Sequence, residues 1–114
     1  MLLDQESYNF VLRGTFFENG SRNDVLAADM DHFWFFNAGE GDRLSLTVTP
    51  DLDSDPYIEL YNPAADRILT LDETLEGEAE SLEDYPLEES GLYSIRIGEF
   101  YFLPMTYQID LSKQ

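Results

Sequence analysis

The sequence contains no cysteine, and this absence excludes two classes of structure. A small secreted domain held by disulfides needs pairs of cysteines, and thiolate metal sites need several of them. His32 is the only histidine, so a zinc site would lack nitrogen ligands as well. The chain must therefore fold through a hydrophobic core, and the metal ions still open to it are hard cations that bind oxygen.

Basic residues are scarce, since six Lys and Arg stand against 24 Asp and Glu, and the formal net charge is −18 at pH 7. Nucleic-acid-binding proteins neutralise phosphates with clusters of Lys and Arg, and here these residues are scattered. The same sign of charge opposes binding to anionic membranes. A cation or a basic protein patch remains a suitable partner, while solubility or adaptation to high salt would explain the charge without any partner.

Long apolar runs are also missing, because nowhere do about 18 apolar residues occur together as a transmembrane helix requires. The first residues, Met1 to Asp4, lack the basic region and apolar stretch of a signal peptide, so we expect a segment of a longer precursor. With 114 residues, 43% of them hydrophobic, the chain can fill one core. We expect a single domain over residues 1–114.

Apolar and polar residues alternate through most of the chain, and helical spacing is nearly absent. We expect a polar turn at residues 19–24 and a connection at 25–30. Residues 72–89 are expected to form an acidic, solvated loop that leads into a short strand, and a brief helix over 76–83 is the alternative. Turn residues separate the expected strands, which lie at 8–16 (broken near Gly14), 32–36, 43–49, 57–61, 67–71, 82–87, 91–97 and 106–111.

The alternation also predicts which side chains face the core. Strict alternation sends Leu44, Leu46 and Val48 to one face, and a similar pattern sends Ile95 and Ile97 inward. In the aromatic run 32–36 we expect Phe33 and Phe35 to point inward, with Trp34 and Phe36 on the opposite face. Seven to eight short strands with one apolar face each predict an all-β fold, a two-sheet antiparallel β-sandwich of jelly-roll type.

Several segments, taken in order, resemble a known family. Residues 29–35 (DMDHFWF) with Ala38-Gly39, then 55–60 (DPYIEL), 90–97 (SGLYSIRI) and 107–111 (YQIDL), are similar to the bacterial pre-peptidase C-terminal domain across residues 8–112. The resemblance implies a non-catalytic, extracellular β-sandwich attached to secreted proteases and other exported proteins. Its implied roles are substrate or matrix binding, secretion or stability, and some relatives in the collagen-binding branch hold calcium.

Carboxylates are the candidate metal ligands, and Ca²⁺ is the cofactor that they suit. A loop site formed by Asp29 and Asp31, with Asp24, is the first candidate; alternatively, Asp29 and Asp31 cap a turn. A second candidate is the acidic loop that contains Asp51, Asp53 and Asp55. This loop is not a helix–loop–helix calcium motif, because Pro56-Tyr57 stands where that motif needs glycine.

Aromatic side chains are the candidate ligand-binding residues. Trp34 lies on the face predicted to point away from the core, and Tyr101 and Phe102 lie in the last hairpin. Exposed rings stack on sugars or anchor a protein interface, so the expected partners are a protein or a polysaccharide surface. Burial beneath long loops is the alternative for Trp34.

Catalytic signatures are missing from the sequence. A Ser-His-Asp triad would need His32, which we expect on a strand surface, and no G-x-S-x-G elbow, phosphate loop or dinucleotide fingerprint is present. We expect a non-enzymatic accessory module of an exported bacterial protein, stabilised by calcium. Three alternatives stay open: a calcium-dependent carbohydrate-binding module, a weakly active hydrolase, and an acidic partner subunit that binds a basic protein.

Overall fold

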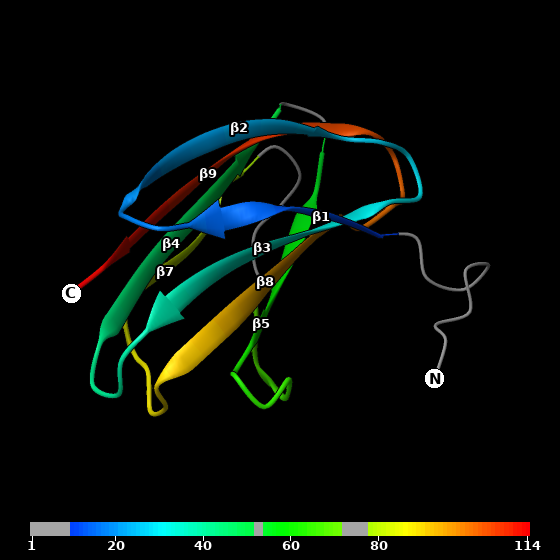
Figure 1. Cartoon of the computed structure of the whole chain (residues 1–114). Coiled ribbons are helices and arrows are strands. Elements are labelled where there is room, and N and C mark those ends of the chain that lie inside the picture. Colours follow the sequence, from blue (N-terminus) through cyan, green and yellow to red (C-terminus); the bar gives the residue numbers. More distant parts are fainter. Residues whose placement is uncertain (1–9, 52–53, 72–77) are drawn as a thin grey trace.

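A computed structural model describes residues 10–51, 54–71 and 78–114 of the chain. Within these residues nine strands form two sheets that pack face to face (Figure 1). The five-stranded sheet has the order β1-β3-β8-β5-β6, and the four-stranded sheet has the order β2-β9-β4-β7. The strands are β1 Phe10–Phe16, β2 Gly20–Leu26, β3 Asp31–Ala38, β4 Arg43–Pro50, β5 Pro56–Tyr61, β6 Arg67–Leu71, β7 Glu80–Pro86, β8 Gly91–Glu99 and β9 Met105–Lys113.

Strands β2 to β9 follow the jelly-roll order, because most connections cross from one sheet to the other and only the β5–β6 hairpin stays within a sheet. Strand β1 is added beside β3 and runs parallel to it, with a register shift between Leu12 and Gly14. The predicted all-β sandwich of jelly-roll type is confirmed, and so is the break in the first strand. The described residues contain nine strands, however, and not the seven or eight expected.

The core lies between the sheets and is built from alternate residues of each strand. Phe36 of β3 and Tyr93 of β8 stand opposite each other on neighbouring strands and stack with their ring centroids 5.3 Å apart. Burying an apolar side chain of this size contributes roughly 1.5–3 kcal/mol to folding. The inward positions predicted from alternation, Leu44, Leu46, Val48, Ile95 and Ile97, are confirmed as buried. Ile58, Leu60 and Tyr93 are buried with them.

The expectation of a turn and a connection over residues 19–30 was wrong, because residues 20–26 form β2. This edge strand pairs antiparallel with β9 along its whole length, from Gly20 opposite Leu111 to Leu26 opposite Met105. Of its side chains only Leu26 is fully buried. A strand with so few apolar residues shows no alternation, and it is held by backbone pairing with an apolar neighbour.

The predicted facing of β3 was also wrong. Trp34 and Phe36 are buried in the core, whereas Phe33 and Phe35 lie on the outer face of the five-stranded sheet. The cross-strand partners set this facing, because Trp34 stands opposite the buried Ile95, and Phe33 opposite Arg96. Five aromatic residues in a row carry no period-two signal, so their own sequence does not select a face.

Strand β7 begins at Glu80, two residues earlier than expected, and pairs with β4. Leu82 stands opposite Leu46, and Tyr85 opposite Leu44, so the two apolar residues of this acidic segment pack against the core. The strand expected near 82–87 is confirmed. The alternative of a helix over 76–83 is contradicted from Glu80 onward, while residues 72–77 lie outside the described part of the chain.

Candidate functional site

The aromatic loop, residues 100–103 between β8 and β9, is the most prominent apolar surface feature. Its four side chains Phe100, Tyr101, Phe102 and Leu103 are between 49% and 61% exposed. The exposure expected for Tyr101 and Phe102 is therefore present. Phe100 and Tyr101 meet edge to face at 5.0 Å between ring centroids, so the rings support one another at the surface.

The buried carboxylate of Glu99, which is 2% exposed, gives this loop its shape. Its Oε1 accepts hydrogen bonds of 2.8 Å from the backbone N–H groups of Tyr101 and Leu103, and its Oε2 accepts one of 3.0 Å from that of Asp55. These bonds compensate for removing the charge from water. Glu99 was not expected as a functional residue, because a glutamate beside exposed aromatics carries no signal of burial.

Two neighbouring connections hold the aromatic loop from either side. The backbone N–H of Asp29, in the β2–β3 turn, donates to the carbonyl of Phe102 at 3.1 Å, and that of Phe100 donates to the carbonyl of Asp55 at 2.8 Å. Figure 1 shows the β2–β3 and β8–β9 connections side by side at one end of the sandwich. Phe102 has a φ of 63°, a left-handed conformation that this network maintains. The loop is thus displayed in a defined shape.

The structure does not bring the predicted calcium ligands Asp24, Asp29 and Asp31 together. Asp24 faces inward on β2 and binds Arg13 through both carboxylate oxygens, at 2.6 and 3.1 Å. Asp31 lies on the outer face of the other sheet and pairs with Arg96 at 2.6 Å. Asp29 is an exposed turn residue. These carboxylates therefore do not fit one shared calcium site.

The second predicted set is used partly for turn formation. Asp51 accepts hydrogen bonds from the Ser54 hydroxyl and from the backbone N–H of Thr106, and this ties the β4–β5 connection to β9. Asp55 is half-buried, and Asp53 lies outside the described residues. In the part of the chain that is described, no group of three His, Asp or Glu side chains could hold a metal ion. Calcium binding stays a prediction.

A polar cluster is buried between β3 and β9. The Tyr107 hydroxyl accepts a 2.9 Å hydrogen bond from the Trp34 Nε1–H and lies 2.6 Å from His32 Nδ1. Tryptophan can only donate, so the Tyr107 hydroxyl oxygen is the acceptor for Trp34, and the same oxygen bonds to the His32 imidazole. Both His32 and Trp34 are buried, which contradicts a surface position for His32 and exposure of the Trp34 ring to a ligand.

The salt bridge between Arg13 and Asp24 lies beside this cluster. Asp24 Oδ2 is 3.9 Å from His32 Nδ1, and Asp24 stands opposite Tyr107 across the β2–β9 pair. Burial lowers the pKa of His32 below its usual 6.5, while the Asp24 carboxylate acts in the opposite direction. Burial also raises the pKa of the Tyr107 hydroxyl, which keeps its proton. The cluster therefore holds a neutral imidazole.

We expect the free energy of unfolding to fall as the pH drops below 6.5, because the unfolded chain then binds a proton at His32 that the folded chain does not. One such group can contribute a slope of at most about 1.4 kcal/mol per pH unit. Urea denaturation from pH 8 to pH 5 measures it. The His32→Gln variant should lose this slope, and an unchanged slope in that variant would contradict the assignment.

A second polar network lies on the outer face of the five-stranded sheet. Arg96 of β8 bridges Asp31 of β3 at 2.6 Å and Glu59 of β5 at 3.3 Å, and Arg67 of β6 binds Glu59 at 2.9 Å. Burial disfavours the charge on Glu59, but hydrogen bonds from Tyr61 and Arg67 outweigh burial and lower its pKa. These groups form an ordered ladder across β3, β8, β5 and β6.

Tyr57 joins the same ladder across a glycine. Its hydroxyl donates to the Asp31 carboxylate at 3.2 Å, directly over Gly98, where an added Cβ would overlap the Tyr57 ring. Burial and the charge of Asp31 raise the pKa of Tyr57 to about 12. Glycine at this strand position thus allows the ring and the carboxylate to meet.

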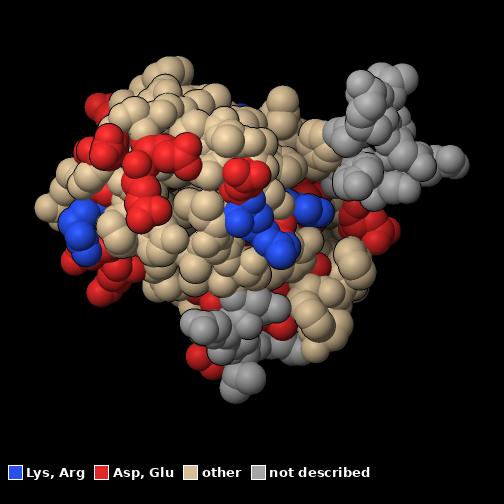
Figure 2. All heavy atoms as spheres, turned by 90° about the horizontal axis from the view of Figure 1, so that it is seen from below, with Lys and Arg blue, Asp and Glu red and all other residues tan. Residues whose placement is uncertain are grey.

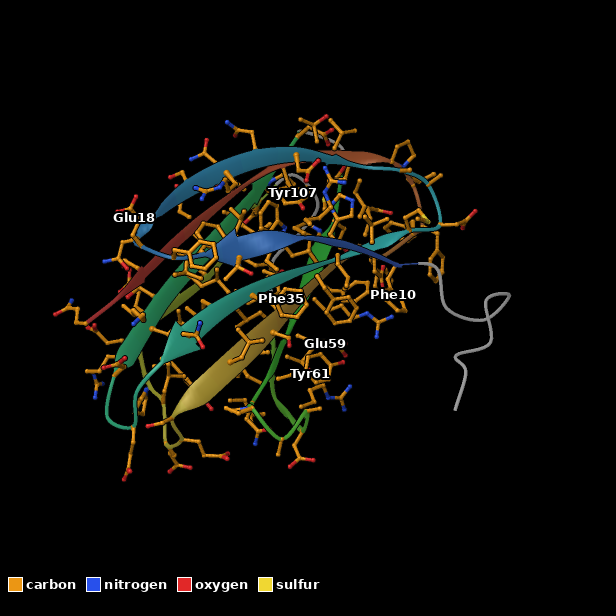
Figure 3. The ribbon with its side chains drawn as sticks, viewed as in Figure 1. Phe10, Glu18, Phe35, Glu59, Tyr61 and Tyr107 are labelled. Atoms are coloured by element: carbon orange, nitrogen blue, oxygen red, sulfur yellow. The ribbon has the colours of Figure 1, made fainter. Side chains whose placement is uncertain are left out.

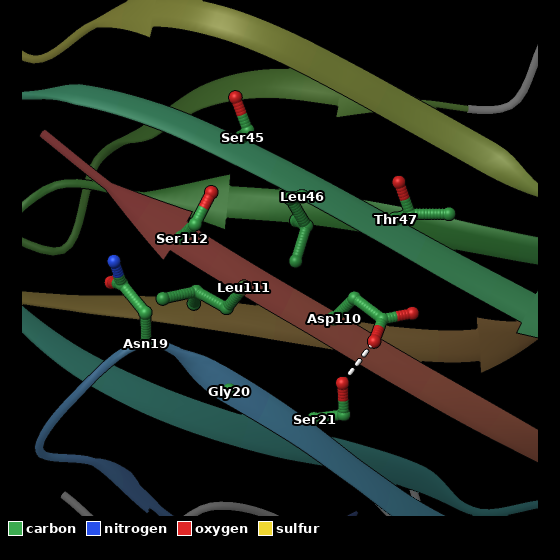
Figure 4. A pocket seen from close by; sticks show the side chains of 9 residues that line it. All are labelled: Asn19, Gly20, Ser21, Ser45, Leu46, Thr47, Asp110, Leu111 and Ser112. Carbon is green, nitrogen blue, oxygen red and sulfur yellow. Dashed lines mark hydrogen bonds between the residues drawn. The ribbon is translucent and has the colours of Figure 1, made fainter.

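The outer face of the four-stranded sheet differs in chemistry. A shallow groove of about 380 Å³ crosses β2, β9 and β4 and is lined mainly by hydroxyl and amide side chains (Figure 4). Ser21 donates to Asp110 within it, and Thr47 lies 3.2 Å from the Ser81 hydroxyl. These polar groups largely satisfy one another, and the groove presents no convergent reactive set.

Comparison with known proteins gives the fold a wider context. No family model matches the chain, and no curated protein matches it. The solved structure of the pre-peptidase C-terminal domain of collagenase from Bacillus anthracis superposes with a TM-score of 0.70 at 12% identity, over 92% of this chain and 96% of that one. The chain has the fold of a pre-peptidase C-terminal domain. The resemblance predicted from its sequence motifs is thus confirmed in structure.

Other proteins share this fold. The periplasmic PliG inhibitor of g-type lysozyme from Aeromonas hydrophila has a TM-score of 0.67 at 15% identity, and covers 93% of this chain and 98% of its own. A surface-associated copper-binding protein, CorA of Methylomicrobium album BG8, has a TM-score of 0.66 at 12% identity, over 90% and 98%. The same sandwich therefore carries different functions, and function must be argued from the surface of this chain.

Proposed function

We propose that this chain is a non-catalytic binding module of an exported protein, and that its aromatic loop docks into an apolar cleft of a basic partner protein. Four adjacent apolar side chains, Phe100 to Leu103, exposed on a loop of defined shape, are the observation that carries the proposal. Apolar and aromatic side chains that lose water in a complex dominate binding energy. A loop already held in shape loses little conformational entropy on binding.

The electrostatic surroundings of the loop favour a basic partner. Both connections that hydrogen-bond to it, residues 27–30 and 51–55, contain acidic residues and no Lys or Arg. Asp29 and Asp51 are exposed there. Elsewhere on the molecule, the basic groups visible in Figure 2 have acidic atoms beside them. Carboxylates around an apolar centre attract a cationic cleft and increase the rate of association at low salt.

The comparisons support an exported binding protein without testing a particular partner. The proteins of the same fold include, by their titles, a collagenase domain, a periplasmic lysozyme inhibitor and a surface-associated copper-binding protein. A lysozyme inhibitor on this sandwich makes g-type lysozyme a suitable first probe. A role without catalysis agrees with these neighbours, and matrix binding or stabilisation of a parent protein would use the same surface.

The experiment measures binding of the chain to g-type lysozyme, c-type lysozyme and cytochrome c by calorimetry at 20 mM and 500 mM NaCl. We expect binding to at least one of these basic proteins, weakened by salt. Phe102→Ala should weaken it about tenfold, because truncating a central interface residue costs more than about 1 kcal/mol. The matched control is Phe17→Ala, which removes an 88% exposed ring from the β1–β2 turn and should change nothing.

Two outcomes would contradict this function. If none of the three proteins binds at low salt, the acidic aromatic end does not act as a docking site for basic proteins. Equal losses in the Phe102→Ala and Phe17→Ala variants would show that any binding is non-specific attraction to a chain of net charge −18.

A further inference from the structure

Aromatic side chains are distributed unequally between the two outer faces of the sandwich. The outer face of the five-stranded sheet carries five rings on three strands, and Figure 3 shows four of its side chains, Phe10, Phe35, Glu59 and Tyr61, on the same side of the sheet. In the described strands of the four-stranded sheet, the outward residues are mostly Ser, Thr, Asn and Gln, with no ring. The five rings are Phe10, Phe33, Phe35, Tyr57 and Tyr61, and all are partly exposed.

Three of these rings form a continuous row across the strands. The ring centroids of Phe10 on β1 and Phe33 on β3 are 5.4 Å apart, and those of Phe33 and Tyr61 on β5 are 6.3 Å apart. Strand β8 lies between β3 and β5, and its Arg96 stands opposite Phe33 of β3 on one side and Glu59 of β5 on the other. The row thus spans the sheet from its β1 edge to β5, about 14 Å at the usual strand spacing.

This face is also balanced in charge, which sets it apart in so acidic a protein. Its two carboxylates, Asp31 and Glu59, are matched by two guanidinium groups, Arg96 and Arg67. The remaining outward residues of these strands are aromatic, aliphatic or small and polar. A ligand here meets no net charge, although the whole chain carries −18. The face therefore favours a neutral ligand.

The polar groups on this face are held in position before any ligand arrives. Tyr61 donates to Glu59 at 2.8 Å, and Tyr57 is fixed over Gly98 by Asp31. Arg67 is bound to Glu59 through Nη1, and its side chain is 59% exposed. The rings and the polar groups at their border are thus already fixed, so ligand binding costs little conformational entropy.

We infer that this outer face binds a neutral polysaccharide chain, as a second binding surface independent of the aromatic loop. Rings stack on the apolar faces of sugar units, while the guanidinium of Arg67 and the hydroxyls of Tyr61 and Ser94 bond to sugar hydroxyls at the border. A row of uncharged rings suits a chain of sugar units, because each sugar ring has apolar faces and carries polar hydroxyls around its edge. A basic protein, by contrast, is attracted to the acidic aromatic end.

Affinity electrophoresis of the intact chain in native gels tests the inference, with hydroxyethyl cellulose, laminarin, xylan or glycol chitin as the probe. At least one of these should retard the chain, at low salt and in 500 mM NaCl, with or without EDTA. Phe33→Ala and Tyr61→Ala should weaken retention about tenfold, as loss of a central stacking ring does. Tyr61→Phe keeps the ring and should retain binding within about threefold.

Two matched controls separate this surface from the others. Thr47→Ala alters the outer face of the opposite sheet, and Phe102→Ala alters the aromatic loop; neither should change retention. Urea denaturation of each variant identifies any loss of binding that follows from unfolding. Retention lost in EDTA would point to a calcium-dependent site and overturn the inference, as would retention lost in Phe102→Ala.

Failure of all four polysaccharides to retard the chain would also overturn the inference. That result leaves docking of a basic protein on the aromatic loop unaffected, because the two surfaces are tested with different probes and only protein binding should weaken with salt. If a basic protein binds and Phe33→Ala rather than Phe102→Ala abolishes that binding, the ring face is a protein interface and the polysaccharide assignment is wrong.

Discussion

Replacing Glu99 with Ala is expected to lower the free energy of unfolding by roughly 3–5 kcal/mol, since a buried carboxylate with several charge-assisted hydrogen bonds is lost. The side chain is 2% exposed and accepts backbone hydrogen bonds from Tyr101, Leu103 and Asp55. Alanine leaves these three donors without their acceptor and opens a cavity beneath the loop. Urea denaturation at pH 7 measures the change.

Glu99→Gln separates the charge from the shape of this residue. The amide oxygen can still accept from Tyr101 and Leu103, but its NH₂ group would face the N–H of Asp55. We expect about half the loss of the alanine variant. Both variants should also weaken binding of a basic protein, because the aromatic loop loses its held shape. A loss below about 1 kcal/mol for Glu99→Ala would contradict this account of the loop.

Replacing Tyr107 with Phe is expected to cost roughly 2–4 kcal/mol, although only one oxygen atom is removed. That oxygen satisfies the Trp34 Nε1–H at 2.9 Å and faces His32 Nδ1 at 2.6 Å. All three side chains are buried, so water cannot readily replace the hydroxyl. The cost of two polar groups left unpaired exceeds that of a typical surface hydrogen bond.

Tyr61→Phe is the matched control, because it removes a hydroxyl that bonds to Glu59 on a partly exposed outer face. We expect a change below about 1 kcal/mol there. Urea midpoints of both variants at pH 7 give the comparison. Equal effects in the two variants would show that the buried cluster is not a special source of stability, and would contradict the pairing of Trp34 and His32 through Tyr107.

Prediction from sequence succeeded where each strand has one apolar and one polar face. Strand β4 alternates strictly, and its inward residues Leu44, Leu46 and Val48 are buried as expected. Strand β6 was placed at 67–71, where the structure has it. Prediction from sequence was wrong for the facing of β3, whose run of aromatics fits either facing. It also missed the strand β2, whose inward positions include the polar Arg22 and Asp24.

For the candidate surfaces, too, some features were predicted from sequence and others were not. Exposure of Tyr101 and Phe102 was expected from a place in a hairpin. The hairpin was wrong, because β8 and β9 belong to different sheets, but both side chains are exposed in the connection between them. The pairing of Asp31 with Arg96, of Asp24 with Arg13, and the burial of His32 were not expected. Each depends on strands that are distant in sequence, so no local pattern reports it.

The sequence by itself determined the extended character of the chain, the strict apolar faces, the acidic surface and the lack of thiol or basic sites, because these follow from residue type and from period-two spacing. Only the tertiary structure decided which face of an aromatic strand enters the core and which carboxylates are neutralised by arginine. Those outcomes depend on the register between strands, where a shift of one residue exchanges the two faces.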